Sequence, residues 1–242
     1  MEYVIGNEYN QSRTIMERLG VDLSKAISLH EYNARREQIP ILVCSGGRFH
    51  DDTLTLSNKL RNVQVPVDVK VILDRHADFN HEAKEQNGSD YCSHALTIYK
   101  EGYLESLHIL GIEEDSQVPQ IQKALGRTGG LESAITGIWS PTKLVYSADI
   151  NKAKEINGKN IHVSVDIDLI PNLDCVGITW GGKTGPSVSE VSDTLRWLVN
   201  NNNLVAFDIV GYYPQDLANS SVTNTQGLLV YKQLIDRVVK TL

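Results

Sequence analysis

The chain has 242 residues, of which 41% are hydrophobic and 22% are charged, and this length is sufficient for one large domain spanning residues 1–242. Its formal net charge is -7 with scattered basic residues, which argues against a nucleic-acid-binding surface, and no apolar run approaches the roughly 18 residues that span a bilayer. The three cysteines lie far apart without a CxxC pair, which argues against a disulfide framework or a thiolate zinc site, so we expect a cytoplasmic protein.

Short runs rich in Val, Ile and Leu recur along the chain and predict β-strands. They are "ILVCSG" at 41–46, "VDVKVILD" at 67–74, "LHILGI" at 107–112, "IHVSVDID" at 161–168 and "LVAFDIVG" at 204–211. Their apolar residues do not alternate strictly with polar ones, which is typical of a sheet covered on both faces.

Helical patterns lie between these strands. One ends at Gly126 after "QIQKAL", and the clearest runs from Ser187 to about Asn200, where Ser187 and Glu190 form an S-x-x-E capping box. The last closes the chain with an apolar face made of Leu228, Tyr231, Leu234, Ile235 and Val238. Strands alternating with helices predict an α/β fold with three α/β/α layers and a mostly parallel central sheet.

Polar clusters follow four of the predicted strands at their carboxyl ends: "GGRFH", "DRHAD", "DID" and "DIVGYYPQD". Parallel strands all point the same way, so these segments converge on one edge of the sheet, where ligands bind in open α/β folds. Together they supply six candidate metal ligands, which are His50, Asp74, His76, Asp78, Asp166 and Asp168.

The spacing of these ligands suits a metal site. Residues at i, i+2 and i+4 of an extended segment share one face, so Asp74, His76 and Asp78 can point at one ion. Imidazoles and carboxylates without thiolates suit Mn²⁺, and also Fe²⁺, Co²⁺, Ni²⁺ or Zn²⁺. Four carboxylates at one edge would repel one another without a large positive charge, and two divalent ions balance them better than one.

The order of four motifs resembles that of the ureohydrolases, which include arginase, agmatinase and formimidoylglutamase. The chain has "GGRFH", "DRHADFN", "YCSHAL" and "SVDIDLIP" where that superfamily has GGDH, DAHxD, a downstream His and S-x-D-x-D. The resemblance extends from about Pro40 to the C-terminus. It implies an arginase-like fold, a small guanidino or amidino substrate and a homo-oligomer, as a trimer or hexamer.

The resemblance also implies roles for individual residues. One Mn²⁺ would be bound by His50, Asp74, Asp78 and Asp166, and the other by Asp74, His76, Asp166 and Asp168. His94 and Asp78 are the candidate catalytic residues, with His94 as the proton shuttle. The implied reaction is attack of a metal-bridging hydroxide on an amidino carbon, with release of urea and an amine.

The chain departs from the superfamily pattern at three places. Arg48 and Phe49 stand between the glycines and His50, and Arg75 replaces a usual Ala. We expect the Arg75 side chain to turn away from the metals, because residues between ligands face the opposite side. Gly211 stands where the superfamily has a Glu that receives the guanidinium group. Nearby residues that could replace it are Tyr212, Tyr213 and Asp216.

Two alternatives remain open from the sequence. The first is a deacetylase-like amidohydrolase with a single zinc ion, because the absence of a carboxylate at Gly211 would suit a neutral amide. The second is a degenerate family member that keeps metal without catalysis, which the changes at Arg48 and Gly211 would explain.

Overall fold

The computed structural model describes residues 2–5, 27–28, 41–44, 51–62, 64–80, 92–126, 141–171, 184–211, 229–230 and 232–237. The strands are β1 (Glu2–Ile5), β2 (Ile27–Ser28), β3 (Ile41–Cys44), β4 (Val69–Leu73), β5 (Ser106–Leu110), β6 (Lys143–Ser147), β7 (Asn160–Asp166) and β8 (Asn203–Val210). The helices are α3 (Asp51–Asn62), α5 (His94–Glu101), α6 (Glu114–Ala124) and α7 (Val188–Asn201), with 3-10 turns η2 (Ile150–Glu155) and η3 (Ile167–Leu169). Residues 229–230 and 232–237 are also helical.

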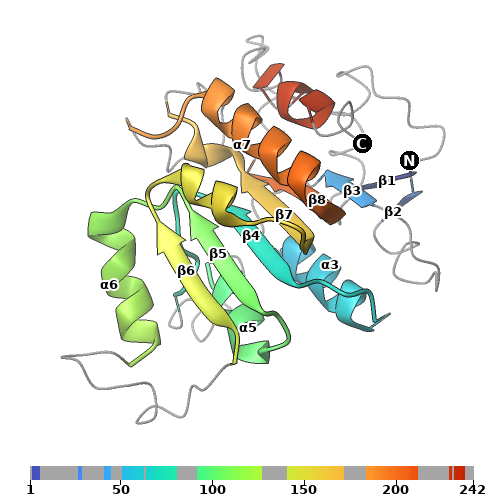
Figure 1. The fold of residues 1–242 in the computed structure, drawn as a ribbon. Helices are drawn as coiled ribbons and strands as arrows, with labels where there is room; N and C mark the ends of the chain where they lie inside the picture. Colours follow the sequence, from blue (N-terminus) through green and yellow to red (C-terminus); the bar gives the residue numbers. More distant parts are fainter. Residues whose placement is uncertain are drawn as a thin grey trace, which may run out of the picture.

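The described strands form one eight-stranded sheet in the order β2-β1-β3-β8-β7-β4-β5-β6 (Figure 1). Every neighbouring pair is parallel. The five strands predicted from the apolar runs are all confirmed, as β3, β4, β5, β7 and β8. The sequence patterns did not predict β1, β2 or β6.

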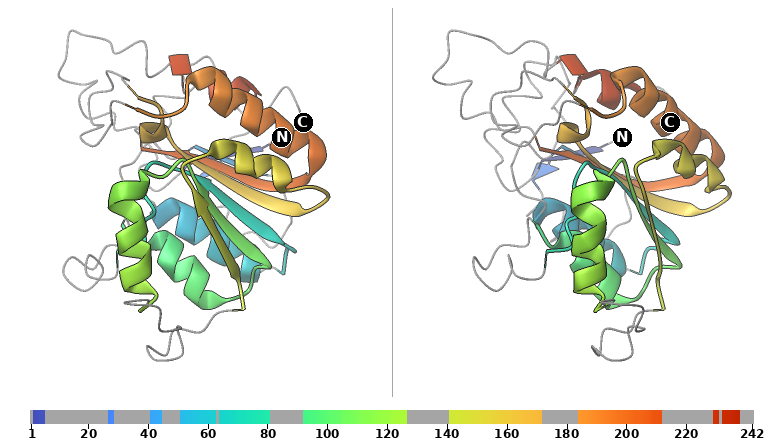
Figure 2. Two further views of the ribbon diagram at one scale, coloured as in Figure 1. Left: turned by 60° about the vertical axis from the view of Figure 1, so that its left-hand side comes forward. Right: turned by 90° about the vertical axis from the view of Figure 1, so that its left-hand side faces the viewer.

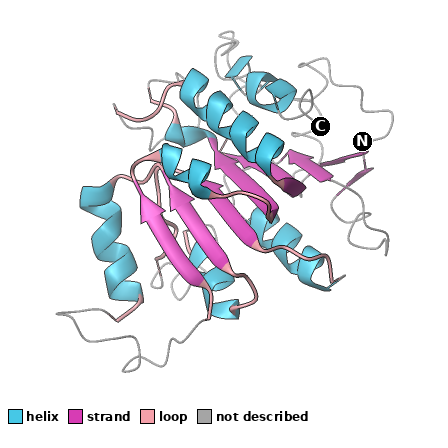
Figure 3. Ribbon diagram, in the orientation of Figure 1, coloured by secondary structure: helices cyan, strands magenta, loops and turns pink. Residues whose placement is uncertain are grey.

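Helices cover both faces of the sheet, which confirms the three-layer α/β/α arrangement (Figures 2 and 3). On one face, α7, η2 and the helical residues near 230–235 pack with residues of β4, β7 and β8 in one apolar cluster. On the other face, α5 and α6 pack with Ile72 of β4 and with β5. Within β4, Val69, Val71 and Leu73 point to the first cluster and Ile72 to the second, as the period of two requires.

The predicted helix ends are confirmed where the structure describes them. Ser187 caps α7, and its side chain and that of Glu190 exchange the two hydrogen bonds of the predicted capping box. Helix α6 ends before Gly126, whose φ of 67° places it in the left-handed region that stops a helix. No helix in the described ranges is both long and apolar enough to cross a membrane.

The strand register brings the polar clusters together. Leu73 of β4 pairs with Val165 of β7, and Asp166 of β7 pairs with Val210 of β8. The residues that follow these pairs therefore lie side by side at the carboxyl edge of the three central strands. Asp74, Asp166 and Gly211 meet there.

Candidate metal centre

Asp74 and Asp166 end neighbouring strands and hold the chain after them in the same way. The Oδ1 atom of Asp74 accepts a hydrogen bond from the backbone N–H of His76 at 2.7 Å. The Oδ1 atom of Asp166 likewise accepts the backbone N–H of Asp168 at 2.9 Å. Each aspartate thus turns the chain so that the residue two positions later stays at the site. An extended strand would carry that residue away from the site.

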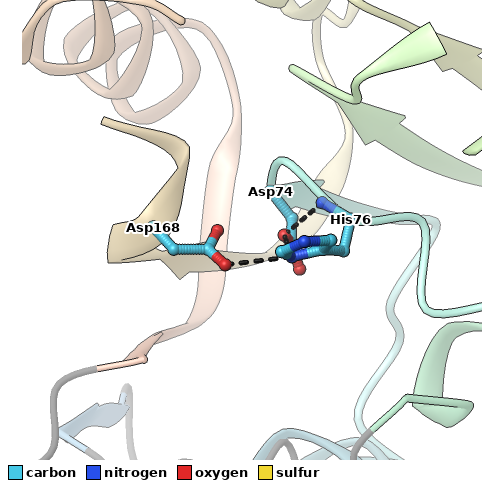
Figure 4. A group of neighbouring side chains, drawn as sticks. All are labelled: Asp74, His76 and Asp168. Carbon is cyan, nitrogen blue, oxygen red and sulfur yellow. Dashed lines mark hydrogen bonds and ion pairs between the residues drawn. The ribbon is translucent and has the colours of Figure 1, made fainter. Parts of the chain in front are cut away.

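Three side chains meet at this edge, drawn in Figure 4. One potential ligand atom from each of Asp74, His76 and Asp168 lies within 4.8 Å of the other two. The Nδ1 atom of His76 is 2.9 Å from Asp168 Oδ2 and 3.7 Å from Asp74 Oδ1. Two carboxylates and an imidazole at this separation can converge on one divalent ion.

The charges around Asp74 favour a bound cation. Burial raises the pKa of Asp74 well above its usual value, and the negative charges of Asp166, Asp78 and Asp168 raise it further, while the hydrogen bond from the His76 N–H opposes them. Within the described residues, Asp74 Oδ2 is buried without a hydrogen-bond partner. A buried carboxylate oxygen without a hydrogen-bond partner, close to three other carboxylates, is poorly stabilised by the protein alone. A divalent cation would bind this oxygen and would also reduce the repulsion between the carboxylates.

The same negative charges also raise the pKa of His76. Burial lowers its pKa, but the hydrogen bond to Asp168 and the charges of Asp168, Asp78 and Asp166 outweigh that effect, so the pKa of His76 is raised. Without metal, the site therefore favours a proton on this imidazole. A metal ion would have to displace that proton.

Asp78 and His94 form a second pair beside this trio. Asp78 has a φ of 50°, a left-handed conformation that Asp adopts more readily than most residues. Its Oδ2 lies 3.0 Å from Nδ1 of His94, the fully buried first residue of α5. The backbone carbonyl of Asp78 also accepts the N–H of Leu96 at 3.3 Å, which attaches this loop to the helix.

The loop after β4 is fixed at several points. The N–H of Asp74 donates to Leu110 O at 3.0 Å, and the N–H of Ala77 donates to the side chain of Gln117 in α6 at 2.9 Å. The loop therefore presents its side chains from a backbone that is bonded to β5 and α6. Such support is what a metal site with defined geometry requires.

Arg75 points away from the carboxylates, as expected from alternation. Its Nε donates to the backbone carbonyl of Asp168 at 3.3 Å, and Nη2 donates to the carbonyl of Thr184. Its Nη1 is 3.6 Å from Glu113 Oε1. The buried guanidinium thus joins the loop that carries His76 to the backbone that carries Asp168.

The comparison with protein families decides what kind of protein carries this site. The family model described as "Arginase family" matches residues 34–235. This chain belongs to the arginase family. Comparison with curated protein sequences gives no match.

Solved structures share the arginase-family fold at low sequence identity. A putative agmatinase from Clostridium difficile is 17% identical with a TM-score of 0.64, covering 99% of this chain and 97% of that one. Arginase from Medicago truncatula is 14% identical with a TM-score of 0.65, covering 98% and 85%. A Trypanosoma cruzi formiminoglutamase variant with Mn²⁺ is 13% identical with a TM-score of 0.66, covering 99% and 92%. The arginase-like fold is therefore confirmed, and these identities support the fold alone.

Several residues predicted from the arginase-family motifs lie outside the described residues. His50 is the one proposed ligand among them, with Arg48 and Phe49 before it. Tyr212, Tyr213 and Asp216, the possible replacements for the missing Glu, also lie there. Their roles stay predictions.

A buried polar cluster in the middle of the sheet was not predicted from the sequence. Lys70 Nζ lies 3.4 Å from Asp208 Oδ2 and 2.8 Å from His162 Nε2, and it also contacts Ser164 Oγ. Asp208 in turn accepts hydrogen bonds from Ser164 at 2.6 Å and, through Oδ1, from Thr53 of α3 at 2.6 Å. The only signal in the sequence was a polar residue on one face of β4 (Lys70) and of β8 (Asp208), and two on the matching face of β7 (His162 and Ser164), in otherwise apolar strands.

Proposed function

We propose that this arginase-family protein hydrolyses a linear C–N bond in a small guanidino or amidino compound with the help of two Mn²⁺ ions. The cluster of Asp74, His76 and Asp168 is the observation that carries the proposal. It places hard and borderline donors together, among excess negative charge, at the sheet edge where α/β enzymes bind ligands.

The four carboxylates divide between two ion positions. Asp168 and His76 would hold one ion and Asp78 the other, with His50 as a further ligand of the second. Asp74 and Asp166, at the adjacent ends of β4 and β7, would help to hold both ions. When bound, such a metal pair would lower the pKa of a water molecule and so supply a nucleophile for an amidino carbon near neutral pH.

His94 would move protons in this reaction. Its Nδ1 lies against the Asp78 carboxylate, which fixes the orientation of the ring. Nε2, the other ring nitrogen, is buried, so the residues around it would have to open before it exchanges a proton with the departing amine. An imidazole suits this role because its ordinary pKa lies close to neutral pH.

Membership of the arginase family supports the proposed domain bounds, localisation and assembly. The metallohydrolase domain would span residues 1–242, the protein would work in the cytoplasm, and it would assemble as a homotrimer or hexamer. A small guanidino or amidino compound would be its partner, with no nucleic acid and no membrane.

One feature favours an alternative substrate. The end of β8 carries Gly211, so it offers no carboxylate to pair with a guanidinium. A neutral amide, cleaved with a single zinc ion, would not need that pair. This alternative predicts one Zn²⁺ per chain and release of a carboxylic acid.

The deciding experiment combines metal content with product analysis on one sample. After loading with Mn²⁺, we expect two ions per chain by plasma mass spectrometry, and urea from agmatine, arginine or 4-guanidinobutyrate. Asp168→Asn should lose metal and activity, whereas Asp193→Asn, which changes an exposed aspartate of α7, should keep both. No bound metal would contradict the proposal, and one zinc with deacylation would favour the alternative.

A further inference from the structure

Gly211 lies directly against the carboxylate of Asp166. Its φ is 86°, in the left-handed region that residues with a β-carbon rarely adopt. A β-carbon at this position would overlap Asp166 Oδ1 and would lie 2.8 Å from Cγ and 3.1 Å from Oδ2. The three nearest atoms all belong to this one side chain, so the carboxylate occupies the space that any other residue would need.

A hydrogen bond also holds the Asp166 carboxylate in place. Its Oδ1 accepts the N–H of Asp168 at 2.9 Å, and Asp166 is only 5% exposed. The backbone pairing of Asp166 with Val210 fixes the distance between the two strand ends. Rotation of the carboxylate away from residue 211 would therefore break the bond that turns Asp168 into the site.

We propose that Gly211 is a positioning residue for the metal centre, because its missing side chain lets the Asp166 carboxylate keep the orientation in which it holds Asp168 beside Asp74 and His76. The inference rests on the proposed function, since it assigns Gly211 to the same metal site. With the backbone of residue 211 at a φ of 86°, a side chain there collides with the Asp166 carboxylate and, through the shared hydrogen bond, disturbs Asp168. A carboxylate at the end of β8 would therefore need a different backbone conformation at this position.

Gly158 provides a matched control. Its φ is 65°, so alanine meets backbone strain there too, but no atom lies within 4 Å of the position of its β-carbon. Gly158→Ala thus measures left-handed strain alone, and Gly211→Ala measures strain together with the collision against Asp166.

The first measurement is Mn²⁺ titration of the full chain, with Co²⁺ absorption as a spectroscopic readout of ligand geometry. For Gly211→Ala we expect the dissociation constant to rise at least about tenfold and the Co²⁺ spectrum to change, since lost support of a ligand typically costs 10–100-fold in affinity. Gly158→Ala should keep the affinity and spectrum of the parent protein. Unchanged Mn²⁺ affinity in Gly211→Ala would overturn the inference.

The second measurement is a double-mutant cycle on metal-free protein, which does not depend on the proposed function. In the parent, Gly211→Ala should lower the denaturation midpoint more than Gly158→Ala does. In an Asp166→Ala background, where the collision partner is gone, Gly211→Ala should lower the midpoint much less than it does in the parent. If Gly211→Ala fails to fold, the Asp166→Ala change should restore folding, and failure to do so would overturn the inference.

The two measurements separate the possible failures. A parent protein that binds no metal contradicts the proposed function. Independent effects of Gly211→Ala and Asp166→Ala on stability contradict the positioning role instead.

Discussion

His76 and Asp168 hold each other across the ends of β4 and β7, with Nδ1 and Oδ2 2.9 Å apart. The two residues are 92 positions apart in the sequence. Without metal, the pair is an imidazole and a carboxylate sharing a proton, and the raised pKa of His76 reflects this. The same two atoms are those that would bind an ion, so proton and metal compete for them.

Metal binding should stabilise the fold through this pair. Mn²⁺ at 100 times its dissociation constant should add about 2.7 kcal/mol to the free energy of unfolding, because it binds only the folded chain. The added stability should be larger at pH 8 than at pH 6, since a proton on His76 opposes the ion. His76→Ala should abolish the effect, as measured by thermal melting with and without Mn²⁺. His108→Gln is the control, and an equal loss there would refute a specific role for His76.

Replacing Arg75 should weaken both the fold and the metal centre. Arg75→Met removes the donors to the carbonyls of Asp168 and Thr184, and a buried group such as the Asp168 carbonyl left without a partner costs about 1–3 kcal/mol. The backbone of Asp168 would also lose a constraint, so Mn²⁺ affinity should fall. Urea unfolding and metal titration measure the two effects.

Arg196→Met is the matched control for Arg75, because Arg196 pairs with Asp193 on the exposed face of α7. It should change stability and Mn²⁺ affinity much less. If the two substitutions had equal effects, the buried contacts of Arg75 would contribute no more to stability and Mn²⁺ affinity than an exposed ion pair does.

Replacing only one member of the ion pair between Lys70 and Asp208 should strongly lower the free energy of unfolding. Burial lowers the pKa of Lys70 to about 8 despite the charge of Asp208. Burial alone would raise the pKa of Asp208, but the charge of Lys70 and the hydrogen bonds from His162 and Ser164 hold it well below its usual value. Lys70→Met leaves that buried charge without its lysine partner and should lower the free energy of unfolding by about 3–5 kcal/mol.

A second substitution tests the cause of that loss. Adding Asp208→Asn to Lys70→Met removes the unpaired charge while keeping a similar shape, so part of the stability should return. Denaturant unfolding of the single and double variants measures this coupling. If the double variant were no more stable than Lys70→Met, lost packing rather than unpaired charge would be responsible.

His108 should make the fold less stable in acid. Burial, assisted by the charge of Lys143, lowers its pKa to about 4. Between about pH 4 and the ordinary His value near 6.5, the unfolded chain binds the proton that the folded chain does not. Stability from this residue should therefore fall as the pH drops from 6.5 to 4, with no further loss below 4.

His108→Gln should reduce that slope, as measured by urea unfolding at pH 7 and pH 4.5. His162, whose burial also lowers its pKa to about 4, remains in both proteins and accounts for part of the slope that persists. An identical slope in the variant would mean that His108 is protonated equally in both states.

Much of the fold could be predicted because its signals are local. The apolar runs at β4, β7 and β8 need a sheet covered on both faces, and Ser187 with Glu190 marks the start of α7. The segment "TLTL" in α3 alternates like a strand, and packing against α5 overrides that pattern. Strand β6 is an edge strand with an exposed start, so its apolar signal is weak.

The sequence by itself determined that Asp74, His76 and Asp168 would lie at the same edge of the sheet, because they follow parallel strands and such strands end at one edge. Only the tertiary structure decided how these residues meet. The register of β4, β7 and β8 sets Asp74 beside Asp166, and it places Gly211 against the Asp166 carboxylate. Such contacts join distant segments, and their distances depend on strand pairing and packing, which no local pattern encodes.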